Sequence, residues 1–404
     1  MPSFDRKLVN RLTVFVLAGL MILTTGIANG QPDGTDRVEA GIYISARLPY
    51  TYQTFVPGTV ADTPAMLVMI HGCNTTAEQQ RHANQLDPIA RRAGFVVLYV
   101  DGSPLNQLQQ RCWSGLFAPA FESRTSGDAA AIAGMTRLAA DRYHVDPSRI
   151  YALGMSSGAF ETALLGAYFP DLFAAIGLHS GAAFGHGALG CVGTYLPTPP
   201  TEQLAAQAFA AQGVHRRVLP MIAFHGDADT TVPVECGRDA VDQWRLTNNM
   251  ALAAEDVPDE IRAEASDIRE AVTEVPGGYP FTVRTWESPT SECPVSQLWT
   301  IHGLGHHWSG GSSAPEASEF TDPRGPNAAE AAWEFFSRIE RTEDGYGCSR
   351  PPSSEVVAAF DQQVGERHRV QDRLPMHDQP GPGICRGSVA RIPAQCSCVP
   401  TCSR

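Results

Sequence analysis

The sequence has 404 residues, of which 43% are hydrophobic, and it carries a formal net charge of −13. A chain of this size can bury the core of one large domain or of two small ones. Its acidic balance excludes the basic surface that proteins use to bind nucleic acid or an anionic membrane, so we expect neither as a partner.

The N-terminus has the layout of a secretory signal peptide. Three basic side chains, those of Arg6, Lys7 and Arg11, precede an apolar run at 12–23 and a small-residue cleavage site at Ala28–Gly30. The apolar run is short for a membrane span, so we predict a signal peptide at 1–30 rather than an uncleaved anchor. The mature protein is therefore expected to be secreted, into the extracellular space or the periplasm.

Cysteine usage agrees with export. All ten cysteines follow the predicted cleavage site: Cys73, Cys112, Cys191, Cys236, Cys293, Cys348, Cys385, Cys396, Cys398 and Cys402. An even number of cysteines in an exported chain favours disulfide bonds over free thiols or a redox centre.

Apolar runs predict the strands. After an opening hairpin within 42–55, such runs cover residues 66–70, 95–100, 150–153, 173–179, 219–225, 281–287 and 297–302. Continuous apolar runs, in place of alternating ones, are typical of strands buried on both faces of a parallel sheet.

Helical patterns alternate with these strands. They are predicted at 76–93, from Ser126 onward with Ile132, Met135 and Leu138 on one buried face, after residue 156, and from Asn327 through a capping-box pattern. Residues 182–216 are expected to form an irregular, lid-like insertion, and the charged stretch around 250–275 a solvent-facing helix. The alternation predicts an α/β fold, a mostly parallel, doubly wound sheet with helices on both faces.

The C-terminal part has a different composition. Residues 342–404 are rich in Pro and Gly, and they end in four closely spaced cysteines. We predict a linker with one short helix at Ser354–Val364, followed by a small disulfide-bonded tail, with a thiolate metal site as the weaker alternative. No aromatic residue follows Phe360, which argues against a polymer-binding module.

One strand runs into a serine motif. The apolar run at 150–153 leads into Gly154-x-Ser156-x-Gly158, which is the pattern of a nucleophile elbow. Small flanking residues allow the sharp turn that exposes the serine, although the same pattern also occurs in ordinary Gly- and Ser-rich turns.

Other strands end in reactive residues as well. His71, Asp229 and His306 follow three further predicted strands, and ligands of doubly wound sheets bind at the carboxyl ends of the strands. Serine, acid and histidine also occur in the chain order of the α/β-hydrolase triad. Their combination favours an active-site serine over an ordinary turn.

With these motifs, the chain resembles the secreted esterases of the poly(3-hydroxybutyrate) depolymerase family, which are similar to feruloyl and acetylxylan esterases. The resemblance covers roughly residues 40–340 and depends on five motifs, at Ile70–Cys73, Cys112–Trp113, Gly154–Gly158, His225–Pro233 and Gly303–Gly311. It implies an α/β-hydrolase domain at 31–341 and a serine esterase that needs no cofactor.

The resemblance also implies roles for individual residues. Ser156 would be the nucleophile, His306 the general base and Asp229 the acid that orients it. The backbone N–H groups of Cys73 and Ser157 would form the oxyanion hole. His71 and His225 are expected to bond loop backbone near the site.

Each role has a rival in the sequence. Ser157 and His307 adjoin chosen triad residues, and Asp227 lies two residues before Asp229, but the motif positions select Ser156, Asp229 and His306. A metal site made of His302, His306 and His307 is disfavoured by the serine motif and by the lack of a suitably spaced carboxylate, so we predict no metal. Trp113 and Trp308 are either packing residues or substrate-binding walls for an acyl or polymer segment.

Two disulfides are predicted. Cys73–Cys112 is implied by the resemblance, in which a His-Gly-Cys loop is bonded to a Cys-Trp loop. Cys236–Cys293 is a further prediction, since these cysteines flank the strands that carry Asp229 and His306.

The functional hypotheses differ mainly in substrate. The first is hydrolysis of a poly(3-hydroxybutyrate)-like polyester or its oligomers, and the second is a feruloyl or acetylxylan esterase acting on plant polysaccharide. A non-catalytic binding protein of the same fold is the third hypothesis, and the complete triad counts against it.

Overall fold

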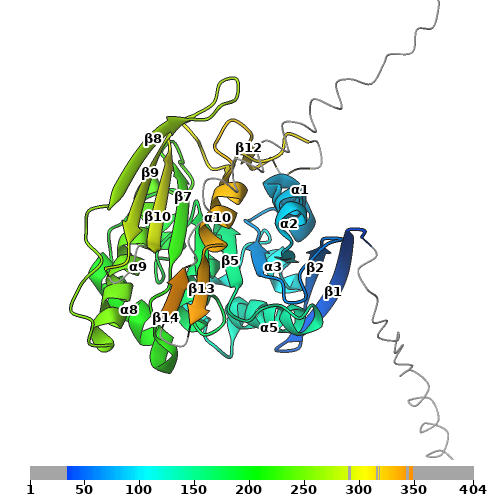
Figure 1. Ribbon diagram of the computed structural model, residues 1–404, viewed down its shortest axis with the longest axis horizontal. Coiled ribbons are helices and arrows are strands. Elements are labelled where there is room, and N and C mark those ends of the chain that lie inside the picture. The colour runs from blue at the N-terminus through cyan, green and yellow to red at the C-terminus, as the bar shows by residue number, and fades with distance from the viewer. Residues whose placement is uncertain (1–33, 290–292, 315–316, 318, 343–344, 349–404) are drawn as a thin grey trace, which may run out of the picture. The chain divides into compact units, whose positions relative to one another are not determined.

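The computed structural model describes residues 34–289, 293–314, 317, 319–342 and 345–348 (Figure 1). The chain divides into two units, Met1–Ser349 and Arg350–Arg404, and the fold below is that of the first. The predicted signal peptide, the predicted helix at Ser354–Val364 and the last four cysteines lie outside the described residues.

A large mixed sheet forms the centre of the described part. Its strand order is β1-β2-β4-β3-β5-β6-β7-β10-β9-β8. The six strands from β4 to β10 in this order are parallel, and the pairs at both edges are antiparallel. The strands are β1 (Arg37–Ser45), β2 (Leu48–Val56), β3 (Met66–Ile70), β4 (Val96–Val100), β5 (Ile150–Met155), β6 (Ala175–His179), β7 (Met221–Gly226), β8 (Asp267–Val272), β9 (Pro280–Glu287) and β10 (Pro294–Ile301).

Helices and small strand pairs connect and cover the sheet. The short pairs are β11 (Trp308–Ser309) with β12 (Thr321–Asp322), and β13 (Ile339–Thr342) with β14 (Gly345–Cys348). The helices are α1 (Ala77–Asn84), α2 (Leu86–Ala93), α3 (Pro104–Leu108), α4 (Ser114–Phe117), α5 (Gly127–Arg142), α6 (Ser157–Tyr168), α7 (Ala188–Cys191), α8 (Thr201–Gln212), α9 (Val234–Ala254) and α10 (Ala328–Phe336), with 3₁₀ turns η2 (Pro119–Phe121) and η3 (Gly213–His215). None of the described helices is both long and apolar enough to cross a bilayer.

The sheet has an apolar core on each face, as the continuous apolar runs predicted. In β3, Met66 and Val68 pack in one core with residues of α5, α6, α8 and α9. Leu67 and Met69 pack in the other core with residues of α1, α2 and α10. The α/β-hydrolase fold is therefore confirmed, with helices on both faces of a mostly parallel sheet.

Three predicted helical features are wrong in detail. The helix predicted at 76–93 is divided at Gln85, which has a left-handed φ of 62°, because Pro88 has no N–H for the carbonyl of Asn84. The helix predicted around 250–275 is instead the end of α9 and the exposed edge strand β8, whose charged residues suit an edge. Leu138 is 43% exposed, and Ala139 takes its place on the buried face of α5.

Three disulfides stabilise the described part of the chain. Cys73–Cys112 is present, as predicted. The predicted Cys236–Cys293 bond is wrong, because the bonds formed are Cys191–Cys236 and Cys293–Cys348. Cys236 lies beyond the carboxyl end of β7, whereas Cys293 precedes β10. Because these neighbouring strands are parallel, the two cysteines lie at opposite ends of the strands. The Cys293–Cys348 bond and β14 also continue the described body past residue 341.

Candidate active site

Ser156 occupies a strained turn between β5 and α6. Its φ of 53° and ψ of −125° lie in a region that non-glycine residues rarely adopt, at a cost of about 1–3 kcal/mol. The flanking glycines allow the turn: a Cβ on Gly154 would lie 2.1 Å from the Gly158 oxygen, and one on Gly158 would lie 2.3 Å from the Ile70 oxygen. The turn thus has the geometry that the Gly-x-Ser-x-Gly pattern predicted.

The structure brings the predicted triad together at the carboxyl ends of three parallel strands. His306 Nε2 lies 2.9 Å from Ser156 Oγ, and His306 Nδ1 lies 2.7 Å from Asp229 Oδ2. Because the carboxylate only accepts, Nδ1 carries the hydrogen, and Nε2 is left to accept the hydroxyl proton of Ser156.

Asp229 is buried and held as an anion. Its Oδ1 accepts hydrogen bonds from the backbone N–H groups of Thr231 and Val232, both at 2.9 Å. Burial by itself would raise the pKa of the Asp229 carboxyl, but the hydrogen bond and charge of His306 outweigh it and keep the pKa below its usual value. The carboxylate is therefore charged at neutral pH and can stabilise an imidazolium at His306.

The structure places two of the rival residues, Asp227 and Ser157, in other environments. Asp227 accepts hydrogen bonds from the His302 ring, at 2.8 Å, and from the N–H of Gly303, at 2.7 Å. His302 and His306 are thus bonded to different carboxylates and do not converge on one point. Ser157 is fully buried in the first turn of α6.

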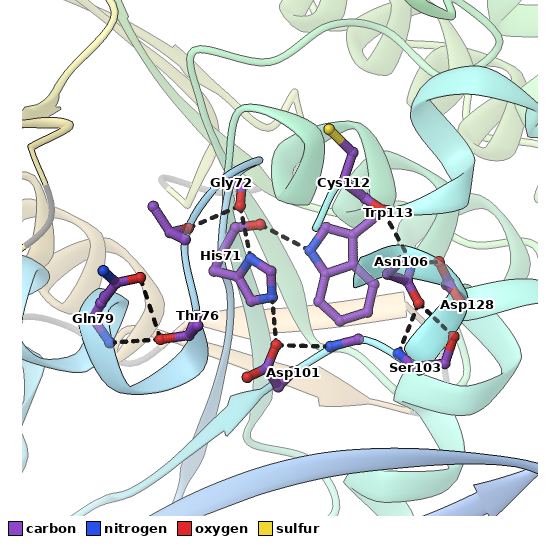
Figure 2. Close-up of polar contacts among 12 residues, drawn as sticks. His71, Gly72, Thr76, Gln79, Asp101, Ser103, Asn106, Cys112, Trp113 and Asp128 are labelled. Atoms are coloured by element: carbon purple, nitrogen blue, oxygen red, sulfur yellow. Dashed lines mark hydrogen bonds and ion pairs between the residues drawn. The ribbon is translucent and has the colours of Figure 1, made fainter. Parts of the chain in front are cut away.

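The loops before the triad residues contain two structural histidines. His71 bonds the Gly72 oxygen, at 2.7 Å, and Asp101, at 3.1 Å, as Figure 2 shows. His225 bonds the Val232 oxygen at 2.7 Å. Both histidines bond backbone beside the site, as the sequence led us to expect.

His179 at the end of β6 connects the serine turn with the histidine loop. Its backbone oxygen accepts from Ser156 N at 2.9 Å, and its ring Nε2 accepts from Ser309 N at 3.1 Å. Burial lowers the pKa of His179 to about 3, with the charges of His225 and His306 acting in the same direction, so the ring is neutral. Sequence reasoning missed this residue, although it also ends an apolar run at the same edge of the sheet.

The predicted oxyanion-hole residues lie on the two segments that meet at Ser156. A Cβ on Gly72 would lie 3.2 Å from Ser156 Cβ, so the loop before Cys73 passes directly beside Ser156. The Gly72 oxygen accepts hydrogen bonds from Thr75 Oγ1 and from the His71 ring. Within the described residues, neither Cys73 N nor Ser157 N donates to a protein acceptor.

The predicted substrate walls are wrong. Trp113 and Trp308 are both completely buried and do not line the cavity at Ser156. The Trp113 indole N–H donates to the His71 oxygen at 2.8 Å (Figure 2), and Trp308 stacks on His179 with 4.9 Å between ring centroids. Both tryptophans therefore pack beneath the active-site loops.

A cavity of 330 Å³ opens beside Ser156 and His306. Its walls are mainly apolar: Leu116, Phe117, Met155, Phe160, Val192, Val232 and Phe320. Polar side chains also contribute, namely Asn74, Thr75, Gln80, Gln110 and Thr231. Most of these residues come from irregular loops, where the sequence gives no periodic signal that could have identified them.

The chain is similar to several known proteins. The model of the family "Esterase PHB depolymerase" matches residues 49–264, a range that includes Ser156 and Asp229. Feruloyl esterase B of Thermothelomyces thermophilus is 31% identical over 215 residues, which are 50% of this chain and 71% of that protein. A probable acetylxylan esterase A of Aspergillus clavatus is 27% identical over 52% of this chain and 67% of its own length. The acetyl xylan esterase structure from Aspergillus awamori shares the fold, with a TM-score of 0.54 and 20% identity, over 74% of this chain and 99% of that one.

Proposed function

We propose that this chain, which belongs to the esterase PHB depolymerase family and is a carboxylic ester hydrolase, acts through an acyl-enzyme formed on Ser156. The observation that carries the proposal is the continuous chain of hydrogen bonds from Asp229 through His306 to Ser156, at 2.7 and 2.9 Å. A hydroxyl is a weak nucleophile at neutral pH, and a base within hydrogen-bond reach removes its proton as it attacks.

Acylation begins with attack of Ser156 Oγ on the ester carbonyl carbon while its proton passes to His306 Nε2. The carbonyl oxygen becomes an oxyanion, which accepts hydrogen bonds from Cys73 N and Ser157 N in our proposal. Loss of one such donor typically costs about 3 kcal/mol of transition-state stabilisation. When the intermediate collapses, the C–O bond to the alcohol breaks and His306 gives its proton to the leaving alcohol oxygen.

Deacylation repeats these steps with water. His306 removes a proton from a water molecule, whose oxygen attacks the acyl carbon, and the bond to Ser156 Oγ then breaks. Ser156 takes back a proton from His306, and the carboxylic acid leaves. Asp229 stays ionised throughout and stabilises the imidazolium in both halves of the reaction.

The cavity favours an acyl group larger than acetyl. Its volume of 330 Å³ falls within the range of about 300–1,000 Å³ that is usual for small-molecule sites, and an acetyl group would leave most of it empty. Apolar walls that include Phe117 and Phe160 suit an aromatic acyl group. Together with the resemblance to feruloyl esterase B, this supports a feruloyl-type ester of a polysaccharide as the first substrate class.

A polyester of the 3-hydroxybutyrate type is the second candidate. Phe117 at the cavity is 55% exposed, and Phe121 in the adjoining turn η2 is 78% exposed. Exposed aromatic side chains beside an active site suit an apolar polymer segment. The family description also names such a polyester.

The disulfide bonds favour an exported location. The three disulfides of the described part would persist in an oxidising compartment. We therefore propose that the protein is secreted.

The test compares three substrates with the purified protein: methyl acetate, methyl ferulate and a poly(3-hydroxybutyrate) film. The two methyl esters share a leaving group, and we expect a higher kcat/KM for methyl ferulate than for methyl acetate and no activity in Ser156→Ala. Film clearing without ferulate release would favour the polyester. An equally active Ser156→Ala variant would refute the acyl-enzyme, and a wild type inactive on all three would support the non-catalytic hypothesis.

A further inference from the structure

Glu161 is a buried acid that the proposed reaction does not use. It lies on α6, the helix that begins just after Ser156, and it is 0% exposed. Its Oε2 accepts a hydrogen bond from the backbone N–H of Gly115 at 3.0 Å. Its Oε1 has no hydrogen-bond partner within the described residues. Such a half-satisfied carboxyl group is costly to bury, and its position calls for an explanation.

Two further carboxylates hold the same short segment. Asp128 Oδ2 accepts from Ser114 N, at 2.8 Å, and from Asn106 Nδ2, at 2.6 Å. Glu122 Oε1 accepts from Ser114 Oγ at 2.5 Å. Figure 2 shows Asn106 between Asp128 and the Cys112–Trp113 backbone. Residues 112–115 are thus fixed from several sides, by carboxyl groups from α6, from the start of α5 and from the loop before it.

Glu161 differs from the other two acids in its number of partners. Glu122 also accepts from the N–H groups of Asp128 and Ala129, and Asp128 also accepts from Tyr50. Burial raises the pKa of Glu161 well above its usual value, and the negative charges of Glu122 and Asp128 act in the same direction. The surroundings therefore favour the neutral form of Glu161, because an ionised form would face two other carboxyl groups.

The segment that Glu161 bonds is a wall of the cavity. Gly115 precedes Leu116 and Phe117, which both line the space beside Ser156. A Cβ on Gly115 would lie 2.3 Å from Leu164 Cδ1 and 2.5 Å from Glu161 Oε2, so α4 lies directly on α6. The position of α4 sets how far Leu116 and Phe117 stand from the nucleophile.

We propose that Glu161 is a positioning residue that, in its neutral form, holds α4 against α6 and so sets the acyl-side wall formed by Leu116 and Phe117. The inference rests on the proposed function, since it assigns that wall to the acyl group. Ionisation of Glu161 would place a third charge beside Glu122 and Asp128, with Tyr168 of α6 also nearby, and would loosen the wall. Arg124, which bonds the backbone oxygen of Tyr168 at the end of α6, has its charge paired with Asp171.

Two variants of Glu161 separate a positioning role from simple packing. Glu161→Gln keeps an oxygen that can accept from Gly115 N and cannot ionise, whereas Glu161→Leu fills the space without an acceptor. At pH 7 we expect the Leu variant to raise KM for methyl ferulate at least tenfold and to change KM for p-nitrophenyl acetate less than twofold. We expect the Gln variant to stay within twofold of wild type for both esters.

The pH profile gives a second readout. As pH rises from 7 to 10, kcat/KM for methyl ferulate should fall more in wild type than in Glu161→Gln, while the acetate profile should be alike in both proteins. Glu202→Gln, which removes the charge of an exposed glutamate on α8, is the matched control and should behave as wild type. If the Leu variant does not fold, this comparison alone decides the matter.

The outcomes distinguish a failure of the proposed substrate class from a failure of the role proposed for Glu161. A wild type that hydrolyses the acetate but no larger acyl ester would refute the proposed substrate class and the inference with it. A wild type active on methyl ferulate, whose Leu variant keeps its KM or whose Gln variant has the wild-type alkaline profile, would refute the inference alone.

Discussion

Replacing Asp229 with Asn should reverse the hydrogen-bond polarity of His306, the proposed general base. Two backbone donors, Thr231 N and Val232 N, point at Oδ1 of Asp229, so the Asn oxygen would occupy that side. The Asn amide N–H₂ would then face His306 Nδ1, which must become an acceptor. The ring hydrogen would move to Nε2, the atom that lies 2.9 Å from Ser156 Oγ.

This tautomer cannot accept the serine proton. The same substitution in the triad of a serine protease lowers kcat about 10⁴-fold. We expect a similar loss here, which corresponds to about 5 kcal/mol of transition-state stabilisation. Both backbone donors keep an acceptor in the Asn variant, so the free energy of unfolding should change by no more than about 2 kcal/mol.

The assay is steady-state hydrolysis of p-nitrophenyl acetate, with stability measured by urea unfolding. Asp227→Asn is the matched control, because Asp227 lies in the same loop and bonds His302 in place of His306. It should retain more than a tenth of the wild-type kcat. If Asp229→Asn keeps a tenth of wild-type kcat, or if Asp227→Asn loses as much as Asp229→Asn does, the assignment of the catalytic acid is wrong.

Three further predictions concern residues around the site. Trp113→Phe should lower the free energy of unfolding in urea by about 1–3 kcal/mol, because it loses the buried hydrogen bond to the His71 oxygen, while KM for p-nitrophenyl acetate stays within twofold. A raised KM at unchanged stability would contradict the packing role of Trp113. Replacing Cys191 and Cys236 together by Ser should cost about 4 kcal/mol in the same assay, since they are 45 residues apart in the chain, and an unchanged unfolding midpoint would count against the bond. His179 has a folded-state pKa of about 3, below the usual 6.5, so the native state binds fewer protons than the unfolded state between these values. The free energy of unfolding should therefore decrease as the pH is lowered below about 6.5, by up to about 1.4 kcal/mol per pH unit. His179→Gln lacks this loss, and unfolding midpoints between pH 7 and pH 4 should show its smaller acid sensitivity.

The sequence predicted the buried strands and the residues at their carboxyl ends, which depend on hydrophobic pattern and strand direction. The continuous apolar runs identified the buried strands, and the positions of Ser156, Asp229 and His306 at strand ends placed them at one edge of the sheet. Parallel strands carry their carboxyl ends to the same edge, so this part of the site follows from topology.

The rest depends on how loops fold over that edge. Trp113 and Trp308 stand in loops beside the site, and only tertiary packing decides that their rings point inward beneath it. The cavity wall at Leu116 and Phe117 comes from a helix of four residues, too short to leave a periodic pattern. The partner of Cys236 likewise depends on the relative direction of β7 and β10, which cannot be read from the spacing of cysteines along the chain.

The Cys73–Cys112 bond joins the segment proposed to bind the carbonyl oxygen of the ester to the segment proposed to bind its acyl group. Cys73 follows the loop beside the nucleophile, and Cys112 begins the segment that leads into α4. For protein engineering this means that acyl preference and rate enhancement are not independent variables in this scaffold. Libraries that vary residues 114–117 to accept new esters should keep both cysteines and be produced in an oxidising host. Under reducing conditions the Cys73–Cys112 bond would be lost, and selection would favour substitutions that restabilise its loops over those that change the substrate.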